Sequence, residues 1–354
     1  MQCFLCMLSF FCLSSTISAY RLNAGVGFNL ELDYGTVSIH FANGSAYDVV
    51  KVEGGASYKD TMRRLSTNDR SYRDEGNSAA PSSKHPPHRV PRFALSTQLQ
   101  DTINYVAALW PRSLPAPTPE AESLLWMLKA LKTATEAYLE QSIRYVEITN
   151  PALLESSATY MADIGSASSA LGLEMGRPQF LAAEAAARTH NVRGRCDEWY
   201  DFPEGFNEDD TQYRLFVAVG YNRAAFSVFL MDEVCDTIFD LRTYHNSSLG
   251  SDSTLPREER HTMLKHALED ITRRPYQSRF NHERIQDVVL FGEATEDRVL
   301  RSVLQEVFGS GLDKLDVGGR QNAIDPLFAA SRGAARDSQL WDIGASNNPQ
   351  GCPI

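Results

Sequence analysis

Three short segments of the sequence combine glycine with polar side chains in a turn, and these residues could do chemistry. They are Asp33-Tyr34-Gly35-Thr36, Gly220-Tyr221-Asn222-Arg223 and Gly292-Glu293-Ala294-Thr295. A glycine lets backbone N–H groups approach a phosphate closely, and Arg223 could add a positive charge. A plain β-turn or a solvated arginine explains the same residues, so no single segment identifies a ligand.

Other catalytic and metal-binding patterns are missing or incomplete. The sequence has no Gly-x-Ser-x-Gly elbow and no His-Glu-x-x-His pair, and its eight histidines do not cluster at ligand spacing. Lys84–Arg89 lacks the further ligands that a metal needs, and the acidic stretch Arg193–Thr211 lacks the alternation of a calcium loop. Asp316–Arg320 lacks the Gly-Lys-Ser/Thr ending of a phosphate loop. We therefore predict neither a hydrolase of these classes nor a metal centre.

Length and charge limit the remaining classes of function. The chain has 354 residues, of which 43% are hydrophobic and 22% charged, and this suits two lobes with sizeable cores. Its formal net charge is -11 and its pI is about 5.3. Because an acidic surface repels phosphate backbones, we expect no nucleic-acid partner.

The N-terminus has the pattern of a secretory signal. Cys3–Leu13 is apolar, and Ser14–Ala19 is small and polar. The apolar run is too short to span a membrane, so we predict a signal peptide over residues 1–19 and a place in the secretory pathway, either secreted or in the ER lumen. The alternative is a buried N-terminal strand. No later stretch predicts a transmembrane segment.

Two further features are consistent with secretion. Asn43 and Asn246 begin glycosylation sequons, although such sequons also arise by chance. In an oxidising compartment we expect Cys196 to pair with Cys235, since both flank the same predicted hairpin, and this leaves Cys352 unpaired.

The elements that must position the three turns follow from hydrophobic periodicity and turn signals. In the first half we predict a hairpin over Val26–Phe41 with a turn at Asn43-Gly44, a polar loop over Ser66–Arg92 and a helix over Thr97–Leu109. A long amphipathic helix over Glu120–Glu140 and a strand over Arg144–Ile148 follow. Two more helices are predicted over Leu154–Leu171 and Ala182–Thr189, with a short strand candidate, Pro178–Leu181, between them. On the long helix we expect one broad apolar face, formed by Leu124, Leu125, Leu128, Leu131 and Tyr138.

The second half repeats this order. After the acidic stretch we predict two strands, a helix, a buried strand and two more helices; these are Arg214–Val219, Ala225–Leu230, Glu258–Thr272, Gln286–Phe291, Glu296–Phe308 and Pro326–Arg336. Hairpin, helix and strand recur in each half, and this order is typical of an α/β protein built from two similar halves.

Six segments in this order resemble the nucleotide-binding domain of the seventy-kilodalton heat-shock proteins. They are Leu128–Leu139, Val146–Ala152, Glu184–Ala187, Leu215–Leu230, Val288–Thr295 and Asp325–Ala335. The resemblance implies a two-lobed actin-like ATPase (ribonuclease H-like) fold with reduced helical subdomains. We then expect a first lobe over 20–192 with a mobile loop at 66–92, an acidic linker at 193–212, a second lobe with a closing helix over 213–343, and a tail at 344–354.

The resemblance also assigns a nucleotide site to the three turns. In that family, two glycine-rich hairpins bring backbone N–H groups to the phosphates of ATP, while acids organise magnesium and water. The residues placed there are Asp33, Gly35, Thr36, Gly220, Asn222, Arg223, Gly292, Glu293 and Thr295. The register of the first hairpin stays open, because by length alone the family motif falls on Asn29–Asp33.

This sequence departs from the family at the residues that do the chemistry. Ala218 and Ala225 stand where the second hairpin has acids, and Ala182 replaces a glutamate that positions the hydrolytic site. Tyr221 and Asn222 replace two glycines. Glu233–Lys265 is too short for the family's helical subdomain over the adenosine, and we expect the family's peptide-binding domain to be missing.

Three hypotheses follow. The first is a chaperone-like protein with a degenerate nucleotide site, acting as a non-hydrolysing binding or scaffolding protein for an unknown protein partner. The second is an ATP-binding ATPase using magnesium, which requires the turns at Asp33 and Gly220 to face each other across a cleft. The third is a secreted structural protein whose cleft is filled by side chains such as Tyr221. We expect ATP or ADP binding to be weak or lost.

Overall fold

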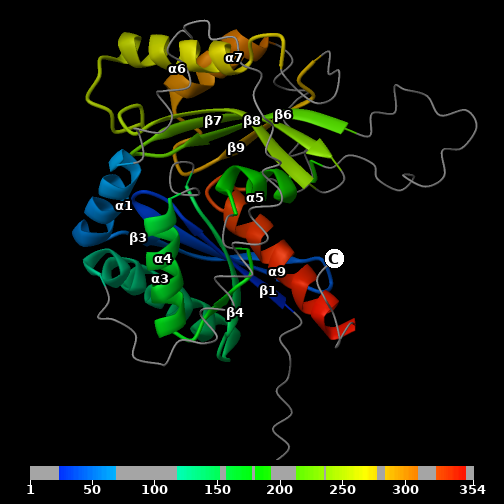
Figure 1. Cartoon of the computed structure of the whole chain (residues 1–354). Coiled ribbons are helices and arrows are strands. Elements are labelled where there is room, and N and C mark those ends of the chain that lie inside the picture. The colour runs from blue at the N-terminus through cyan, green and yellow to red at the C-terminus, as the bar shows by residue number, and fades with distance from the viewer. Residues whose placement is uncertain are drawn as a thin grey trace, which may run out of the picture.

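The chain folds as a mixed α/β protein with two sheets, in a computed structural model that describes residues 24–68, 118–151, 157–177, 180–192, 213–234, 237–276, 284–309 and 324–347. One sheet carries helices on its outer face in the lower part of Figure 1, and the other carries helices above it, with two further helices between the sheets. We call the lower part the first lobe and the upper part the second lobe.

The first lobe is built on a five-stranded sheet in the order β3-β2-β1-β4-β5. Its strands are β1 (Ala24–Leu30), β2 (Tyr34–Phe41), β3 (Ala46–Glu53), β4 (Tyr145–Thr149) and β5 (Glu174–Met175). β1 to β3 form an antiparallel meander, and β4 joins β1 in parallel, pairing Phe28 with Ile148. Because β1 and β4 run in parallel, the turn between β1 and β2 lies at the same edge of the sheet as the end of β4.

Three helices cover the outer face of this sheet: α1 (Ala56–Asn68), α3 (Pro119–Leu139) and α4 (Ala158–Ala170). α3 begins where the Thr118 hydroxyl accepts a hydrogen bond from the Ala121 N–H at 3.0 Å, and a proline occupies its first position. The predicted apolar face is confirmed for its buried leucines, whereas Tyr138 is 48% exposed and was wrongly placed there.

The second lobe repeats the arrangement with a four-stranded sheet in the order β8-β7-β6-β9. Its strands are β6 (Tyr213–Tyr221), β7 (Phe226–Val234), β8 (Thr237–Asn246) and β9 (Asp287–Phe291). Again a meander of three strands is joined in parallel by a later strand, β9, beside the first. Helices α6 (Arg257–Ile271) and α7 (Arg298–Phe308) cover its outer face.

Two helices between the sheets, α5 (Ala182–Thr189) and α9 (Ala329–Asn347), are held by very close backbone approaches. A Cβ atom at Gly25 or Gly27 of β1 would lie 2.0 or 2.1 Å from a backbone carbonyl oxygen of α9. A Cβ at Gly333 would lie 1.8 Å from the Ala185 carbonyl oxygen of α5. Glycine is therefore needed at these three positions, because even the methyl group of an alanine would push these elements apart.

Most predicted elements are confirmed, and the differences have physical reasons. The sequence pattern predicted neither β3 nor β8, each of which is a third, half-exposed strand of a meander without a strong apolar alternation. Of the strand candidate Pro178–Leu181, only Phe180 and Leu181 are described, and there Leu181 forms an isolated bridge with Asn150. Residues 66–68, assigned to the polar loop, belong to α1, and α9 continues to Asn347 beyond the proposed boundary at 343.

Several predictions fall on residues that the structure does not describe. They are the signal peptide at 1–19, the loop beyond 68, the helix at Thr97–Leu109, the acidic linker at 193–212, the Cys196–Cys235 disulfide and the Asp316–Arg320 loop. Among the helices that are described, none combines the length and apolarity required to cross a membrane.

Candidate functional site

The three turns singled out in the sequence meet at the boundary between the lobes. Asp33 ends the turn between β1 and β2, Asn222 and Arg223 form the turn between β6 and β7, and Glu293 follows the end of β9. Each turn stands at the same end of its sheet, because β6 and β9 run in parallel and β1 runs in parallel to β4. The fold thus brings together residues that are far apart in the sequence.

The side-chain amide of Asn222 is the centre of the contacts. Its Oδ1 accepts hydrogen bonds from the Tyr34 hydroxyl at 2.8 Å and the Glu293 backbone N–H at 3.1 Å. Its Nδ2 donates to Glu31 Oε2 at 2.9 Å. Asn222 is 5% exposed, so one buried amide joins all three turns.

Ion pairs surround this amide. The Arg223 Nε donates to Glu293 Oε1 at 2.8 Å and lies 3.7 Å from Asp33 Oδ2. Lys51 on β3 contacts Glu293 and Glu53, and its Nζ lies 4.9 Å from the centre of the Tyr34 ring. We call this group the inter-lobe network; it consists of Glu31, Asp33, Tyr34, Lys51, Glu53, Asn222, Arg223 and Glu293.

Burial controls the protonation of the acids in the inter-lobe network. Burial, and next the charge of Asp33, raises the pKa of Glu31 to about 8. Burial, and next the charge of Glu293, raises the pKa of Asp33 to about 6, although Arg223 acts in the opposite direction. At neutral pH Glu31 therefore holds a proton, and the cations Lys51, Lys59 and Arg223 are shared among the remaining carboxylates.

The predicted glycines serve packing in this structure. A Cβ at Gly35 would lie 3.1 Å from both Leu131 and Met127 of α3, and one at Gly220 would lie 2.6 Å from the Phe291 ring. Gly292 has a φ of 105°, and a Cβ there would lie 2.4 Å from Asn222 Oδ1. Each glycine therefore allows a close protein–protein contact.

The two predicted threonines lie inside the protein. Thr36 is fully buried on β2, and its Oγ1 has no hydrogen-bond partner among the described residues. Thr295 is 2% exposed. The structure thus joins Asp33, Asn222, Arg223 and Glu293 by side-chain contacts and leaves the threonines outside the inter-lobe network.

Three alanines, which the resemblance places at acidic positions of the heat-shock family, are parts of apolar clusters. Ala218 and Ala182 pack in the cluster around α5 and α9, and Ala225 packs against the core of the first lobe. Tyr221 is also buried, but in the core of the second lobe, so it does not fill the space between the lobes as one hypothesis expected. An acid at any of these alanines would need a partner that the apolar surroundings do not offer.

Sequence reasoning missed four members of the inter-lobe network: Glu31, Tyr34, Lys51 and Glu53. Lys51 and Glu53 stand two residues apart on β3, and residues at this spacing share one face of a strand. If β3 had been predicted, this spacing would have placed Lys51 and Glu53 on the same face of the strand. Glu31 was visible in the alternative register of the first hairpin, without a role.

The site has no arrangement for a metal ion in the described ranges, where no group of three or more His, Cys, Asp or Glu side chains could hold one. Of the two predicted glycosylation residues, Asn43 lies past the far end of β2 from the inter-lobe network, whereas Asn246 pairs with Phe226, at the end of the second sheet that carries the Asn222 turn. Asn43 is exposed in the turn between β2 and β3, and Asn246 ends β8, where its side chain bonds Tyr244 and Ser248.

Comparisons with other proteins do not assign the chain to a family. No model of a known protein family matches it, and no curated protein sequence matches it.

Proposed function

We propose that this chain is a non-hydrolysing binding or scaffolding protein with an actin-like ATPase fold related to the heat-shock chaperones, in which the inter-lobe network takes the place of bound nucleotide. The observation that carries the proposal is Asn222, whose buried amide ties the three turns that would otherwise surround phosphates. The repeated sheet order and the two glycine-spaced helices between the lobes support the fold assignment.

The charges of the inter-lobe network argue against tight ATP binding. Arg223 and Lys51 are the cations that would attract a phosphate, and both already contact Glu293. A phosphate would have to displace this carboxylate and then lie beside Asp33, which would repel it. The alanines at 182, 218 and 225 offer no oxygen to hold magnesium or water.

A second candidate, an ATP-binding ATPase, is favoured by one observation. The turns at Asp33 and Arg223 lie opposite each other, with the carboxylate and the guanidinium 3.7 Å apart, which is part of what this hypothesis requires. In that case the ion pairs would open to admit ATP and magnesium. Arg223 would then turn from Glu293 to the phosphates.

Calorimetric titration of the purified chain with ATP and magnesium, followed by a phosphate-release assay, separates the two candidates. We expect no binding tighter than about 1 mM and no turnover above buffer. Lys265→Met is the control for the loss of one positive charge. Lys265 is an exposed lysine on α6, which covers the outer face of the second sheet, away from the turns.

The ATPase hypothesis predicts a different pattern. ATP would bind with a dissociation constant of roughly 10 μM or better, Arg223→Gln would weaken it at least about tenfold, and Lys265→Met would not. Steady turnover by the unchanged chain, lost in Arg223→Gln, would overturn the non-hydrolysing proposal.

A further inference from the structure

The turn between β2 and β3 carries one of the two glycosylation sequons, and hydrogen bonds define its backbone. The Phe41 N–H donates to the Ser45 carbonyl oxygen at 2.8 Å, and the Gly44 N–H donates to the Phe41 carbonyl oxygen at 2.9 Å. Gly44 has a φ of 84°, so glycine suits the last position of this three-residue hairpin loop. The sequon Asn43-Gly44-Ser45 therefore lies at the tip of a hairpin, where Asn43 is exposed.

The side chain of Asn43 is held by its oxygen atom. Oδ1 accepts hydrogen bonds from the Ser45 N–H at 2.9 Å and from the Ser45 hydroxyl at 2.6 Å. In the described part of the chain no residue bonds Asn43 Nδ2, which is the atom to which a glycan is attached. A Cβ atom at Gly44 would meet no atom within 4 Å, so the space beside the turn can hold a large group.

The second sequon has a more crowded environment. Asn246 is half-buried at the end of β8, and its Nδ2 donates to the Tyr244 hydroxyl at 3.2 Å. Tyr244 packs against the core of the second lobe, with its ring centre 6.2 Å from that of Phe226. Leu249, just after the sequon, is fully buried. A sugar on Asn246 would therefore displace Tyr244 and press against a packed segment.

Two aromatic side chains lie close to Asn43 on the hairpin. The rings of Phe41 and Tyr47 meet edge to face, with their centres 5.6 Å apart and an angle of 85° between their planes. Ile39 pairs with Tyr47 and stands two residues before Phe41, so all three side chains share one face of the hairpin. Ile39 is buried in the core of the first lobe, whereas Tyr47 is 48% exposed. The aromatic pair thus extends this core to the surface beside the turn.

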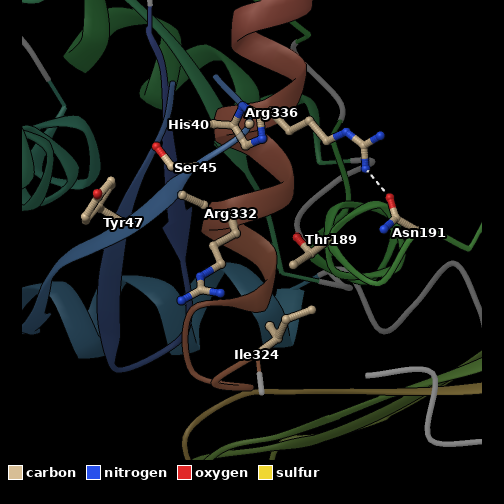
Figure 2. A pocket seen from close by; sticks show the side chains of 10 residues that line it. His40, Ser45, Tyr47, Thr189, Asn191, Ile324, Arg332 and Arg336 are labelled. Carbon is tan, nitrogen blue, oxygen red and sulfur yellow. Dashed lines mark hydrogen bonds between the residues drawn. The ribbon is translucent and has the colours of Figure 1, made fainter. Parts of the chain in front are cut away.

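The opposite face of the hairpin turns toward α9. His40 Nδ1 lies 2.6 Å from Gln339 Oε1 of this helix, and Figure 2 shows His40 directed toward α9 and Tyr47 directed away from it. On the α9 side, a hollow of 1020 Å³ separates the turn from the end of α5, with Ser45 in its lining. The aromatic pair therefore lies on the face that α9 does not cover.

We propose that Asn43 is the N-glycosylation site of this chain in the secretory pathway, that the first sugar packs on Phe41 and Tyr47, and that Asn246 stays unmodified. The apolar C–H face of a sugar ring packs on aromatic side chains, which supply a large and rigid contact area. The proposal concerns the route that the N-terminal pattern predicts. It is independent of the function proposed for the inter-lobe network.

The modification is a group transfer from a lipid-linked oligosaccharide diphosphate. Asn43 Nδ2 forms a bond to the anomeric carbon of the first N-acetylglucosamine and gives up one proton, while the bond from this carbon to the diphosphate oxygen breaks and the lipid diphosphate leaves. Transfer takes place on the emerging chain, so the fold determines which modified chains can pack. A glycan on Asn43 stays in solvent, whereas one on Asn246 opposes the packing of Tyr244.

Peptide mapping of the chain secreted by cultured eukaryotic cells tests the site. Two versions are compared: the full chain, and a chain in which a proven secretion signal replaces residues 1–19. Release of glycans by peptide N-glycosidase in heavy-oxygen water leaves labelled aspartate at each glycosylated position. We expect the label at Asn43 and none at Asn246. Asn43→Gln should remove the whole mass of the glycan, and Asn246→Gln should remove none of it.

The outcomes separate the acceptor site from the route of the chain. A label at Asn43 in the second version alone supports the site and contradicts the predicted signal peptide. No label at Asn43 in either version, or a label at Asn246 in the folded secreted chain, overturns the proposal.

Thermal unfolding before and after removal of the glycan tests the packing on the aromatic pair. In the unchanged chain, removal should lower the unfolding midpoint by at least about 1 °C. In Tyr47→Thr this decrease should be about half as large or less, because the sugar has lost its main exposed contact. Tyr138→Gln, at a tyrosine of α3 that is also 48% exposed, should keep the full decrease. Equal decreases in the unchanged chain and Tyr47→Thr, or no decrease in the unchanged chain, overturn the proposed packing.

Discussion

Glu31 is a carboxyl group that burial keeps protonated. It lies 5% exposed, beside the acid Asp33, while the amide donors Asn29 and Asn222 favour its ionised form. Arg223 and Lys51 contact other carboxylates, so burial outweighs the two amide donors. The protonated state of Glu31 is therefore part of the contact between the two lobes.

A pH dependence of stability follows from Glu31. Its pKa is about 8 in the folded state against 4.5 as the ordinary value, so the folded chain holds a proton that the unfolded chain releases between these values. The free energy of unfolding should therefore fall as pH rises from about 5 to about 8 and then level off. Glu31→Gln should remove the share of this fall that belongs to Glu31, while the shares of Asp33 and Glu147, whose pKa values are also raised, remain. It should be more stable than the unchanged chain at pH 8.5, by roughly 2–4 kcal/mol.

Urea denaturation at several pH values measures this difference. Glu122→Gln, at an exposed position on α3, is the matched control and should keep the pH dependence of the unchanged chain. Parallel pH curves for the unchanged chain and Glu31→Gln would show that Glu31 is ionised in the folded state.

At the residue scale, the sequence indicated which turns would meet but not what their side chains would do. Asp33, Asn222, Arg223 and Glu293 were chosen as nucleotide contacts, and the structure shows that they contact one another. Whether a turn arginine binds a phosphate or a carboxylate depends on a partner far away in the sequence. Periodicity and turn signals carry no information on such pairs.

The close crossing of α5 and α9 depends on the absence of one side chain. Gly333→Ala would place a methyl group 1.8 Å from the Ala185 carbonyl oxygen, if the helices did not move. Alanine favours a helix by about 1 kcal/mol over glycine, but separating two packed helices should cost more, and we expect a net loss of about 2 kcal/mol.

Gly165→Ala supplies the matched control for this prediction. Gly165 also lies inside a helix, α4, but a Cβ there would meet only a Met175 methyl group at 4.0 Å. This substitution should stabilise the chain by about 0.5–1 kcal/mol in thermal or urea unfolding. If both substitutions stabilise the chain alike, the crossing is not as close as described.

At the element scale, the sequence predicted segments that bury a continuous apolar face. β9, α3 and α5 were found because each has a dense apolar or alanine-rich pattern. β3 and β8 were missed because they are outer strands with mostly half-buried residues. Their pairing partners β2 and β7, not their own composition, determine that they are strands.

For the whole molecule, the inter-lobe network and the pair of helices α5 and α9 are two separate connections between the lobes. Breaking the network by a Lys51→Met, Arg223→Met double exchange should loosen the turns while both sheets stay intact. Backbone amide exchange should become at least about tenfold faster in the turns around Asp33 and Asn222, and unchanged in β9. The control is a double substitution, Lys265→Met with Arg301→Met, which removes two surface ion pairs of the second lobe. Its backbone amides should exchange hydrogen at the same rates as those of the unchanged chain.

The glycines of β1 have a consequence for the order of events during synthesis. β1 is synthesised before every other described element, yet the helix that lies directly on Gly25 and Gly27 is α9, which is synthesised after all of them. Among the described helices, α9 is the one that packs against β1, so until it emerges the inner face of the first sheet lacks this cover, however complete its outer helices are. We therefore expect the first lobe to complete its packing only after residue 329 has been synthesised, and a nascent chain paused earlier to present the glycines of β1 to its surroundings.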